Sequence, residues 1–424
     1  MFKNLERLRS KGVDRVEPGL QRITAVLREL SSPHAQKDYV AVAGTNGKGS
    51  VASCVASILQ TNGYRTGLFT SPHLIKVTER IKINEEEISA EALENILETV
   101  FAACERIEVK LSYFEMLTAA AFLHFNRRSI DIGVLEVGMG GRWDSTNVCD
   151  HVVGVITNVS FDHTEYLGNT LGKIAAEKAG IIKKNGLVVT GCTGEPLSVV
   201  ERSCQENSAR CLSLRTDFTY RENEDMSFDY IGPKWRLEHL KTSLTGPHQL
   251  ENAALSVAAA ELLTTHTSYG TNPEKIKKAL SEVSLRGRME YLDRKLPVVI
   301  DVAHNPAAAE KLVESLEFYH PEKKFNFLVT MLDKKDIGGF TKILSRVSGK
   351  LIVTELTGAE RHLQTEKILS LVRGKFDSVE MVKDIWEAYQ KLLGYGEAAC
   401  VCGSFYLIGY LKEALENEET FHSN

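Results

Sequence analysis

Residues 39–50 have the sequence YVAVAGTNGKGS, and this stretch decides the fold of the N-terminal part of the chain. A short apolar strand, 39–43, ends in a turn with three glycines, and a helix-like segment follows from 49 to 60. Such a turn points successive backbone N–H groups at one place, next to the positive end of a helix. Lys48 adds a positive charge, and Ser50 carries an oxygen that can reach a metal ion or a phosphate. The stretch therefore predicts a binding site for the phosphates of a nucleoside triphosphate.

The spacing of this turn differs from the Walker A pattern. That pattern has a glycine five residues before its Gly-Lys pair, where this chain has Val42, and here Gly49 separates Lys48 from Ser50. An alternative interpretation is that the glycines only allow the chain to turn. Because a strand precedes the turn and a helix follows it, we favour phosphate binding.

Composition limits the class of protein. The chain has 424 residues, enough for two or three domains, and 43% of them are hydrophobic, which is ample for large buried cores. The net charge of −5 comes from mixed acids and bases and gives no electrostatic reason to expect nucleic acid binding. No apolar run is long enough to span a membrane, the N-terminus lacks an apolar signal core, and eight cysteines are too few for a disulfide scaffold. We therefore expect a cytoplasmic protein.

Strand-like and helix-like stretches alternate between about residues 38 and 194. The strand candidates are continuously apolar, which is typical of a parallel sheet covered by helices on both faces. They lie at 39–43, 66–70, 132–137, 152–157 and 187–190, with helices at 90–104, 113–125, 171–182 and 197–207. Residues 215–245 follow a roughly alternating polar and aromatic pattern, which predicts a small antiparallel sheet before an alanine-rich helix at 249–263.

A second α/β pattern begins beyond residue 281. Its strand candidates are 298–302, 324–329, 351–354 and 399–403, and its helix candidates are 306–316, 363–373 and 385–393. About 140 residues suit an independent domain. The sequence thus predicts an α/β protein with a mostly parallel central sheet and a small antiparallel sheet in residues 1–283, and a second α/β domain in residues 284–424.

An acidic residue, Glu136, ends the predicted strand at 132–137 and is followed by a glycine-rich loop. Ligands of parallel sheets bind at the carboxyl ends of the strands. A carboxylate at that edge, across from a phosphate loop, is well placed to hold Mg²⁺. The alternative is a buried acid that caps a turn.

Asp162 and His163 follow the next strand, 152–157. Histidine is an unusual ligand for Mg²⁺, which prefers oxygen. From chemistry alone, His163 is interpreted as a hydrogen-bonding or acid–base group.

Lys178 lies in an otherwise apolar helix end, within the segment Glu177-Lys178-Ala179-Gly180-Ile181. By itself this pattern favours a surface lysine whose stem packs on apolar neighbours while its amine stays in water. A buried lysine near metal-binding carboxylates would need a functional reason.

The second domain repeats the strand, polar cluster and helix order at residues 300–306. Asn305 and Pro306 suit the start of a helix, directly after Asp301 and His304. Arg286 and Arg288 lie just upstream and are suited to clamp a phosphate, although an exposed basic linker is an equally simple interpretation.

Taken together, these segments resemble the Mur ligase superfamily, and more closely the folylpolyglutamate synthases and their bifunctional dihydrofolate synthase forms. The resemblance extends from about residue 18 to 412. The matching segments are residues 44–50, 70–74, 136–147, 161–163, 177–181, 248–252 and 301–306.

The resemblance implies a P-loop-type ATPase domain and a Rossmann-like glutamate ligase domain, with the active site between them. It implies that ATP contacts a set of loop and second-domain residues, Thr45, Asn46, Gly47, Lys48, Gly49, Ser50, Asn252, Arg288 and Asp301. It assigns Mg²⁺ to Ser71, Glu136 and His163, with a second Mg²⁺ and K⁺ as further candidates. The candidate catalytic residues are Lys48, His163, Lys178 and His304.

The resemblance also implies that Lys178 is carbamylated to N6-carboxylysine, which converts a cation into a carboxylate-like metal partner. It places the folate or pteroate near Ser112, Tyr113, Phe114, Glu115, Trp143, Asp144 and Ser145. Bifunctional members often carry Leu and Ala where this chain has Trp143 and Ser145.

The implied reaction forms an acyl phosphate on a folate or dihydropteroate carboxylate, which the α-amine of L-glutamate then attacks. The expected partners are these small molecules, and the expected state is a monomer. Two alternatives are a Mur-type cell-wall ligase and a non-catalytic nucleotide switch. Only about 37 residues precede the first strand, which disfavours a cell-wall ligase with an extra uridine-nucleotide domain, and the Arg288 and Asp301 motifs disfavour a switch.

Overall fold

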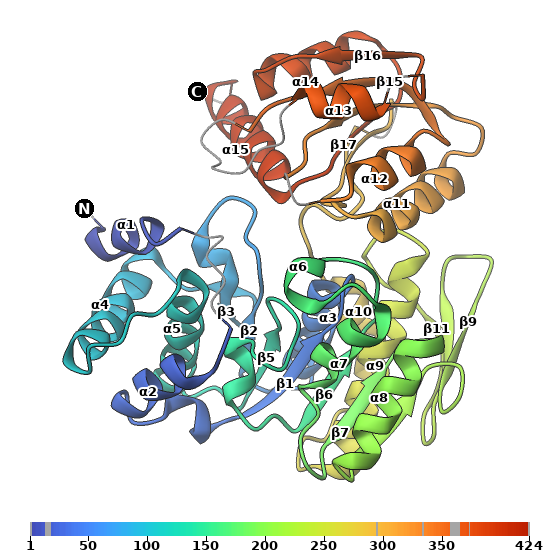
Figure 1. The fold of residues 1–424 in the computed structure, drawn as a ribbon. Coiled ribbons are helices and arrows are strands. Elements are labelled where there is room, and N and C mark those ends of the chain that lie inside the picture. The colour runs from blue at the N-terminus through green and yellow to red at the C-terminus, as the bar shows by residue number, and fades with distance from the viewer. Residues whose placement is uncertain are drawn as a thin grey trace. The chain divides into compact units, whose positions relative to one another are not determined.

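The computed structural model describes residues 2–12, 18–293, 296–332, 335–356, 365–372 and 374–422 (Figure 1). These form two compact units. Unit 1 contains Met1–Pro72, Val77–Ser243 and Gln249–Ser284, and unit 2 contains His73–Lys76, Leu244–His248 and Leu285–Asn424.

An eight-stranded sheet forms the centre of unit 1, with the order β4-β3-β2-β5-β1-β6-β7-β8. Its strands are β1 (Asp38–Ala43), β2 (Thr66–Phe69), β3 (Ile81–Ile83), β4 (Glu86–Glu87), β5 (Ile132–Glu136), β6 (Val153–Ile156), β7 (Leu187–Thr190) and β8 (Arg210–Ser213). All neighbours are parallel except the β2–β3 and β3–β4 pairs. The five strands predicted between residues 38 and 194 are confirmed, whereas β3, β4 and β8 were not predicted.

Helices of unit 1 cover this sheet. They are α1 (Lys3–Arg9), α2 (Gln21–Glu29), α3 (Lys48–Thr61), α4 (Ala90–Arg106), α5 (Tyr113–Arg127), α6 (Thr164–Leu167), α7 (Leu171–Ala179), α8 (Gly194–Glu206), α9 (His248–His266, which begins in unit 2) and α10 (Pro273–Glu282). Short 3₁₀ turns lie at η1 (Pro33–Gln36), η2 (Val77–Arg80) and η3 (Ser145–Val148). Along β1, Tyr39 packs with the cluster of α4 and α5, while Ala41 and Ala43 pack with α7 and α8. Tyr39, Ala41 and Ala43 occupy every second position of β1, so their side chains point to the same face of the sheet. Helices α4, α5, α7 and α8 therefore lie on that face.

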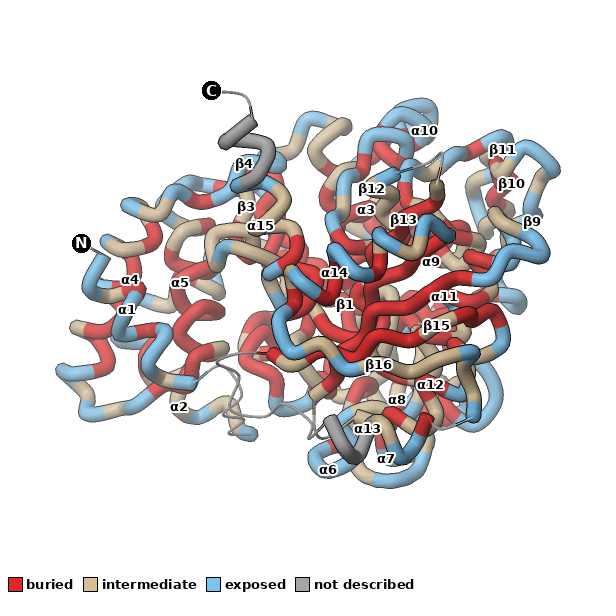
Figure 2. Tube along the Cα trace, turned by 90° about the horizontal axis from the view of Figure 1, so that it is seen from above, coloured by how far each residue is buried: buried red, intermediate tan, exposed pale blue. Residues whose placement is uncertain are grey.

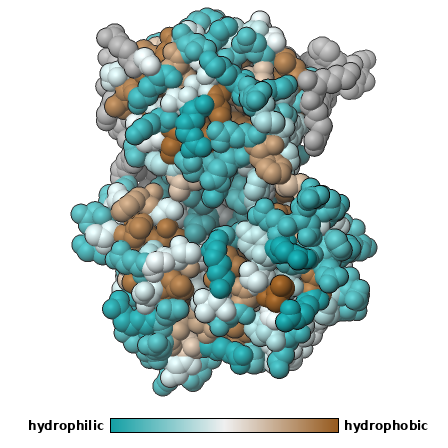
Figure 3. Space-filling model, turned by 90° about the vertical axis from the view of Figure 1, so that its right-hand side faces the viewer, coloured by the Kyte–Doolittle hydropathy of each residue, from teal (hydrophilic) through white to brown (hydrophobic). Residues whose placement is uncertain are grey.

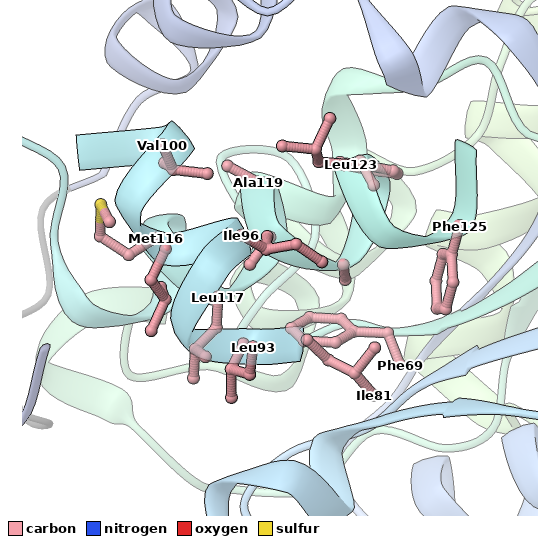
Figure 4. Packing of buried hydrophobic residues seen from close by; sticks show 14 of the residues in the cluster. Phe69, Ile81, Leu93, Ile96, Val100, Met116, Leu117, Ala119, Leu123 and Phe125 are labelled. Carbon is pink, nitrogen blue, oxygen red and sulfur yellow. The ribbon is translucent and has the colours of Figure 1, made fainter. Parts of the chain in front are cut away.

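The largest cluster described on this face joins α4 and α5 to the sheet. Figure 4 shows Phe69 and Ile81 from the strands facing Leu93 of α4 and Leu117 of α5. Helix α5 is buried along most of its length, as the red segments in Figure 2 show. A hydrophobic helix with so few exposed residues is stabilised by packing, because burial of each large apolar side chain contributes about 1.5–3 kcal/mol.

A separate three-stranded antiparallel sheet lies in unit 1, as the alternating pattern at 215–245 predicted. Its strands are β9 (Thr219–Glu222), β10 (Phe228–Ile231) and β11 (Arg236–Leu240). Glu261 on α9 anchors the β10–β11 turn, because its carboxylate accepts hydrogen bonds from Tyr230 Oη at 2.7 Å and Trp235 N at 3.1 Å, and one from Lys234 N. Only 1% of Glu261 is exposed.

Replacing this buried carboxylate is expected to destabilise unit 1. In Glu261→Gln the amide oxygen can still accept from the two backbone N–H groups, but an NH₂ replaces the oxygen that accepts from Tyr230 Oη, and the charge that strengthens all three hydrogen bonds is lost. The free energy of unfolding should therefore fall by about 1–3 kcal/mol in a urea titration. The exposed Glu274→Gln on α10 is the matched control and should change stability by less than about 0.5 kcal/mol. Equal stability of the two variants would show that Glu261 does not anchor the turn.

Unit 2 contains a six-stranded sheet with the order β12-β13-β17-β14-β15-β16. Its strands are β12 (Glu290–Asp293), β13 (Val298–Ile300), β14 (Phe325–Val329), β15 (Ser348–Val353), β16 (Ser378–Met381) and β17 (Ala399–Cys402). Only the β12–β13 pair is antiparallel. The four predicted strands are confirmed as β13, β14, β15 and β17, whereas the two edge strands were not predicted.

Helices cover both faces of this sheet, as expected for a Rossmann-like domain. They are α11 (Pro306–Tyr319), α12 (Ile337–Leu344), α13 (Thr365–Val372), α14 (Ile385–Gly394) and α15 (Phe405–His422). Side chains of α11 and α12 share one cluster with strands β14 and β15, and those of α14 and α15 share the cluster on the other face. Leu363, Gln364 and Arg373 of the predicted helix 363–373 lie outside the described residues.

The face shown in Figure 3 is mostly hydrophilic, and its hydrophobic residues form small separate groups. Across the described residues, no helix is both long and apolar enough to cross a membrane.

Candidate active site

The glycine turn predicted to bind phosphate connects β1 to α3 at the middle of the unit 1 sheet. Strand β1 lies between β5 and β6, so the turn is flanked by the carboxyl ends of both neighbours. Gly47 has φ +81° and precedes the first residue of α3, Lys48. A Cβ atom on Gly44 would lie 1.8 Å from Thr157 Oγ1, and one on Gly47 would lie 2.4 Å from Asn252 Oδ1. Only glycine fits at these two positions.

Residues that follow β6 hold this turn in place. Asn158 accepts from the Asn46 N–H at 3.0 Å and donates to the Asn46 carbonyl at 3.0 Å, while Thr157 Oγ1 donates to the same carbonyl at 2.6 Å. Thr45 Oγ1 accepts from the Ser160 N–H at 3.0 Å. Thr157 and Asn158 were not predicted as site residues. Their position directly after the strand beside β1 is the signal that could have indicated them.

The first residues of α3 carry the charge and the hydroxyl of the predicted phosphate site. Lys48 Nζ donates to the Thr45 carbonyl at 3.0 Å, which folds the amine back over the turn. Ser50 is buried in the first turn of the helix. Asn252 of α9 lies against Gly47 and donates to Gln249 Oε1 at 2.9 Å. The structure thus brings the predicted residues 45–50 and Asn252 together.

Glu136 lies next to this turn, as its position at the end of β5 predicted. Its side chain is buried, and its Oε2 accepts from the Ser71 N–H at 2.9 Å. A Cβ atom on Gly49 would lie 3.5 Å from the same oxygen. A buried carboxylate beside a serine and a phosphate turn is a donor set that suits a hard divalent cation such as Mg²⁺ or Mn²⁺.

His163 is placed differently from these residues. It precedes α6 with φ +50°, its side chain is 42% exposed, and its Nε2 lies 3.9 Å from Asp162 Oδ1. The described residues contain no group of three or more His, Cys, Asp or Glu side chains arranged to hold a metal. Of the three predicted metal ligands, Ser71 and Glu136 are hydrogen-bonded to each other. The metal-binding role of all three residues stays a prediction.

Lys178 is buried, so the interpretation as a surface lysine is wrong. Only 3% of the residue is exposed, and Nζ donates to the Gly44 carbonyl of the phosphate turn at 2.7 Å. Burial, together with the positive charge of Lys48, lowers the pKa of Lys178 to about 7. The sequence pattern places Lys178 at a helix end but does not show what packs against that end. Burial of the lysine depends on tertiary contacts, because it results from the packing of the helix against the sheet.

The residues predicted to contact folate fall into two groups. Ser112 and Glu115 form the capping box of α5, and Ser145 Oγ lies 2.7 Å from Thr118 Oγ1, so these polar groups already have partners within the protein. Tyr113 is buried with Arg80 over its ring at 5.4 Å, and Asp144 accepts from the Met139 and Thr146 N–H groups at 3.0 Å.

Trp143 and Phe114 remain the residues best able to meet an aromatic substrate. Trp143 is 49% exposed in the loop after β5. Phe114 is half-buried and lies against Gly138 in the same loop, where an added Cβ would be 2.6 Å from Phe114 Cζ.

Unit 2 holds its own cluster of predicted residues at the end of β13. Asp301 accepts from the Met289 N–H at 2.9 Å and the Ala303 N–H at 2.7 Å. Burial raises the pKa of Asp301, while the nearby Arg288 opposes that rise. Arg288 lies over the Phe405 ring at 5.1 Å, and His304 Nδ1 lies 2.9 Å from the Val302 carbonyl.

The start of α11 forms as predicted, since Asn305 caps the helix by accepting from the Ala308 N–H at 2.8 Å and Pro306 occupies its first position. Arg286, by contrast, is 54% exposed at its side chain and pairs with Glu416 at 3.0 Å, as the linker interpretation expects.

Comparison with known families agrees with this geometry. Residues 42–260 match the Mur ligase middle domain, and residues 287–405 match the Mur ligase, glutamate ligase domain. The Bacillus subtilis dihydrofolate synthase/folylpolyglutamate synthase is 32% identical over 419 residues, which is 95% of this chain and 96% of that protein.

Two solved structures are similar over nearly the whole chain. The Escherichia coli FolC protein in complex with DHPP and ADP is 28% identical, with a TM-score of 0.89 over 98% of this chain and 97% of that chain. The Yersinia pestis bifunctional folylpolyglutamate synthase/dihydrofolate synthase complexed with AMPPNP and Mn ion is 28% identical, with a TM-score of 0.87 over 97% of each chain.

The two α/β units and the phosphate turn define an ATP-dependent ligase of the Mur type. Within that class, the chain belongs to the folylpolyglutamate synthase/dihydrofolate synthase family.

Proposed function

We propose that this enzyme joins L-glutamate to a folate, and to dihydropteroate, in a reaction driven by ATP. The observation that carries the proposal is the buried Glu136 carboxylate beside the Lys48 phosphate turn, in a chain that matches both Mur ligase domains. Solved structures of relatives with AMPPNP and Mn ion, and with DHPP and ADP, support ATP, a divalent metal and a small-molecule acceptor as its ligands.

The phosphate turn and α3 bind and orient the nucleotide. Backbone N–H groups at the start of α3 and the Lys48 amine offset the negative charge of the γ-phosphoryl group while it moves to the substrate carboxylate. ADP leaves, and an acyl phosphate is formed. The divalent cation, for which Glu136 and Ser71 are suited, supplies further charge neutralisation when bound.

The second step forms the amide bond. The α-amine of glutamate attacks the acyl carbon, a C–N bond forms, the C–O bond to phosphate breaks, and the amine gives up a proton. Positioning and electrostatics supply most of the rate enhancement in such a reaction. His304 and the His163–Asp162 pair are the two candidates to accept the proton. Trp143 and Phe114 are the candidates to contact the pterin ring. Dependence on K⁺ and a monomeric, cytoplasmic state stay predictions.

The direct test is to assay purified protein with ATP, Mg²⁺ and L-glutamate and to measure ADP and the glutamylated product. Tetrahydrofolate, dihydropteroate and a uridine-nucleotide-linked muramyl peptide serve as parallel acceptors. Product with tetrahydrofolate supports folylpolyglutamate synthase activity, and product with dihydropteroate supports the second activity. Turnover only with the muramyl peptide, or with none of the three, would overturn the proposal.

A second test concerns the metal. Glu136→Gln keeps the size of the side chain but removes its charge, so the Mg²⁺ concentration needed for half-maximal activity should rise about tenfold or more and maximal activity should fall. Glu274→Gln is the control for a charge change at an exposed glutamate. Identical Mg²⁺ titrations of Glu136→Gln and wild type would remove Glu136 from the metal site.

A further inference from the structure

The loop at residues 138–147 caps the C-terminal end of α7. The last carbonyls of an α-helix have no partner within the helix. Here the Arg142 N–H donates to the Glu177 carbonyl at 2.9 Å, Arg142 Nη2 donates to the Ala176 carbonyl at 3.1 Å, and Asn147 Nδ2 donates to the Gly180 carbonyl at 3.0 Å. One loop therefore supplies hydrogen bonds to three carbonyls at the end of α7 and just beyond it, of which the Glu177 carbonyl also accepts from the Gly180 N–H at 3.3 Å.

The loop and the helix end are also in close backbone contact. A Cβ atom on Gly141 would lie 2.8 Å from the Lys178 carbonyl oxygen, and a Cβ atom on Gly180 would lie 2.6 Å from Arg142 Cα. From the other side, Lys183 Nζ donates to the Asn147 carbonyl at 3.0 Å. Because these contacts leave no space, the loop cannot shift without moving the last turn of α7.

That last turn carries Lys178, whose amine contacts the Gly44 carbonyl of the phosphate turn at 2.7 Å. The position of the amine therefore depends on the turn that the loop caps. The same loop presents the exposed Trp143 beside Arg142. None of these contacts was expected from the sequence, because residue 142 lies 36 positions before residue 178.

We propose that Arg142 is a positioning residue that fixes the last turn of α7 and thereby holds the Lys178 amine against the phosphate turn. Its effect on catalysis rests on the proposed ligase function. The ion pair of Arg142 with Glu177, at 3.5 Å and with the Arg142 side chain 46% exposed, contributes little by itself. The hydrogen bond to the Ala176 carbonyl gives Arg142 its role, since a cation at a helix C-terminus binds the orphan carbonyls and the negative end of the dipole.

The test compares Arg142→Ala and Arg142→Lys with wild type, with Arg106→Ala as control. Arg106 lies in the last turn of α4 and pairs with Glu29 at 2.7 Å. Removing its side chain should therefore lower the stability of the protein by an amount similar to the loss in Arg142→Ala, but at a helix end far from α7. Ligase kinetics are measured together with amide hydrogen exchange at Ile181 and Ile182, which donate to the Lys178 and Ala179 carbonyls.

For Arg142→Ala we expect kcat to fall about tenfold or more, the KM for ATP to stay within about twofold, and exchange at Ile181 and Ile182 to accelerate at least about fivefold. Arg142→Lys should recover most of kcat, and Arg106→Ala should match wild type. Unchanged kcat in Arg142→Ala, or lost kcat without faster exchange, would overturn the proposal. If wild type makes no glutamylated product, the proposed function fails, while the exchange measurement still decides whether Arg142 fixes the helix end.

Discussion

Lys178→Ala is expected to lose ligase activity by about 10²–10³-fold, and a small carboxylate such as acetate should restore part of it. Lys178 is buried against the phosphate turn, and its pKa is lowered to about 7. Near pH 7 the Lys178 amine is therefore neutral in about half of the molecules. A lysine with an ordinary pKa is neutral in fewer than about one molecule in a thousand at this pH. The neutral amine reacts with carbon dioxide to form a carbamate, so Lys178 is a strong candidate for this modification.

The pH dependence follows from the same shift. Below pH 7 the Lys178 amine is protonated and cannot be carbamylated, so activation by bicarbonate should be lost as the pH falls through about 7 and regained as it rises. Intact-mass measurement under bicarbonate should show one added carbon dioxide, which Lys178→Met should lack.

Two results separate a functional from a structural role for Lys178. Lys178→Met keeps the length of the side chain without the amine, so it should remain folded yet inactive. Lys184→Ala, a change at an exposed lysine just beyond α7, should keep full activity. Near-normal turnover of Lys178→Ala, with no mass increase in wild type under bicarbonate, would show that the buried amine has no catalytic role.

Lys48→Ala should reduce turnover by at least about 10³-fold while the protein stays folded. The Lys48 amine lies over the phosphate turn, bonded to the Thr45 carbonyl at 3.0 Å, and is placed to offset charge on the γ-phosphoryl group. Binding of ADP, which lacks that group, should weaken much less than turnover. The measurement is kcat together with ADP affinity by calorimetry.

An exposed lysine on α10, Lys275→Ala, serves as the control and should leave both quantities unchanged. If a folded Lys48→Ala variant turned over at the wild-type rate, the assignment of the turn to ATP would be wrong.

Much of the candidate site could be predicted because it is local in the sequence. The order of strand, glycine turn and helix at residues 39–50 sets backbone conformation over a few residues, and Gly47 has φ +81° as that turn requires. Asn305 and Pro306 likewise start α11 through their own side chains. The position of Glu136 followed from one further rule, that parallel strands end at a common edge.

Contacts between distant segments could not be predicted in this way. The strands that were not predicted, β3, β4, β8, β12 and β16, are short, between two and four residues, and carry too weak a pattern to be recognised. The sequence likewise gives no local signal that residues 73–76 and 244–248 belong to unit 2.

The amino-acid sequence by itself therefore determined the α/β class, the phosphate turn, the acid at the end of β5 and the family resemblance, because each depends on neighbouring residues or on motif order. Tertiary structure decided that Lys178 is buried on the Gly44 carbonyl, that Glu261 anchors the small sheet and that Arg142 caps α7. Burial and hydrogen bonding of a charged side chain depend on which segments fold against it. The pattern around Lys178 is the same for a surface lysine and a buried one until the sheet and the loop at residues 138–147 are in place.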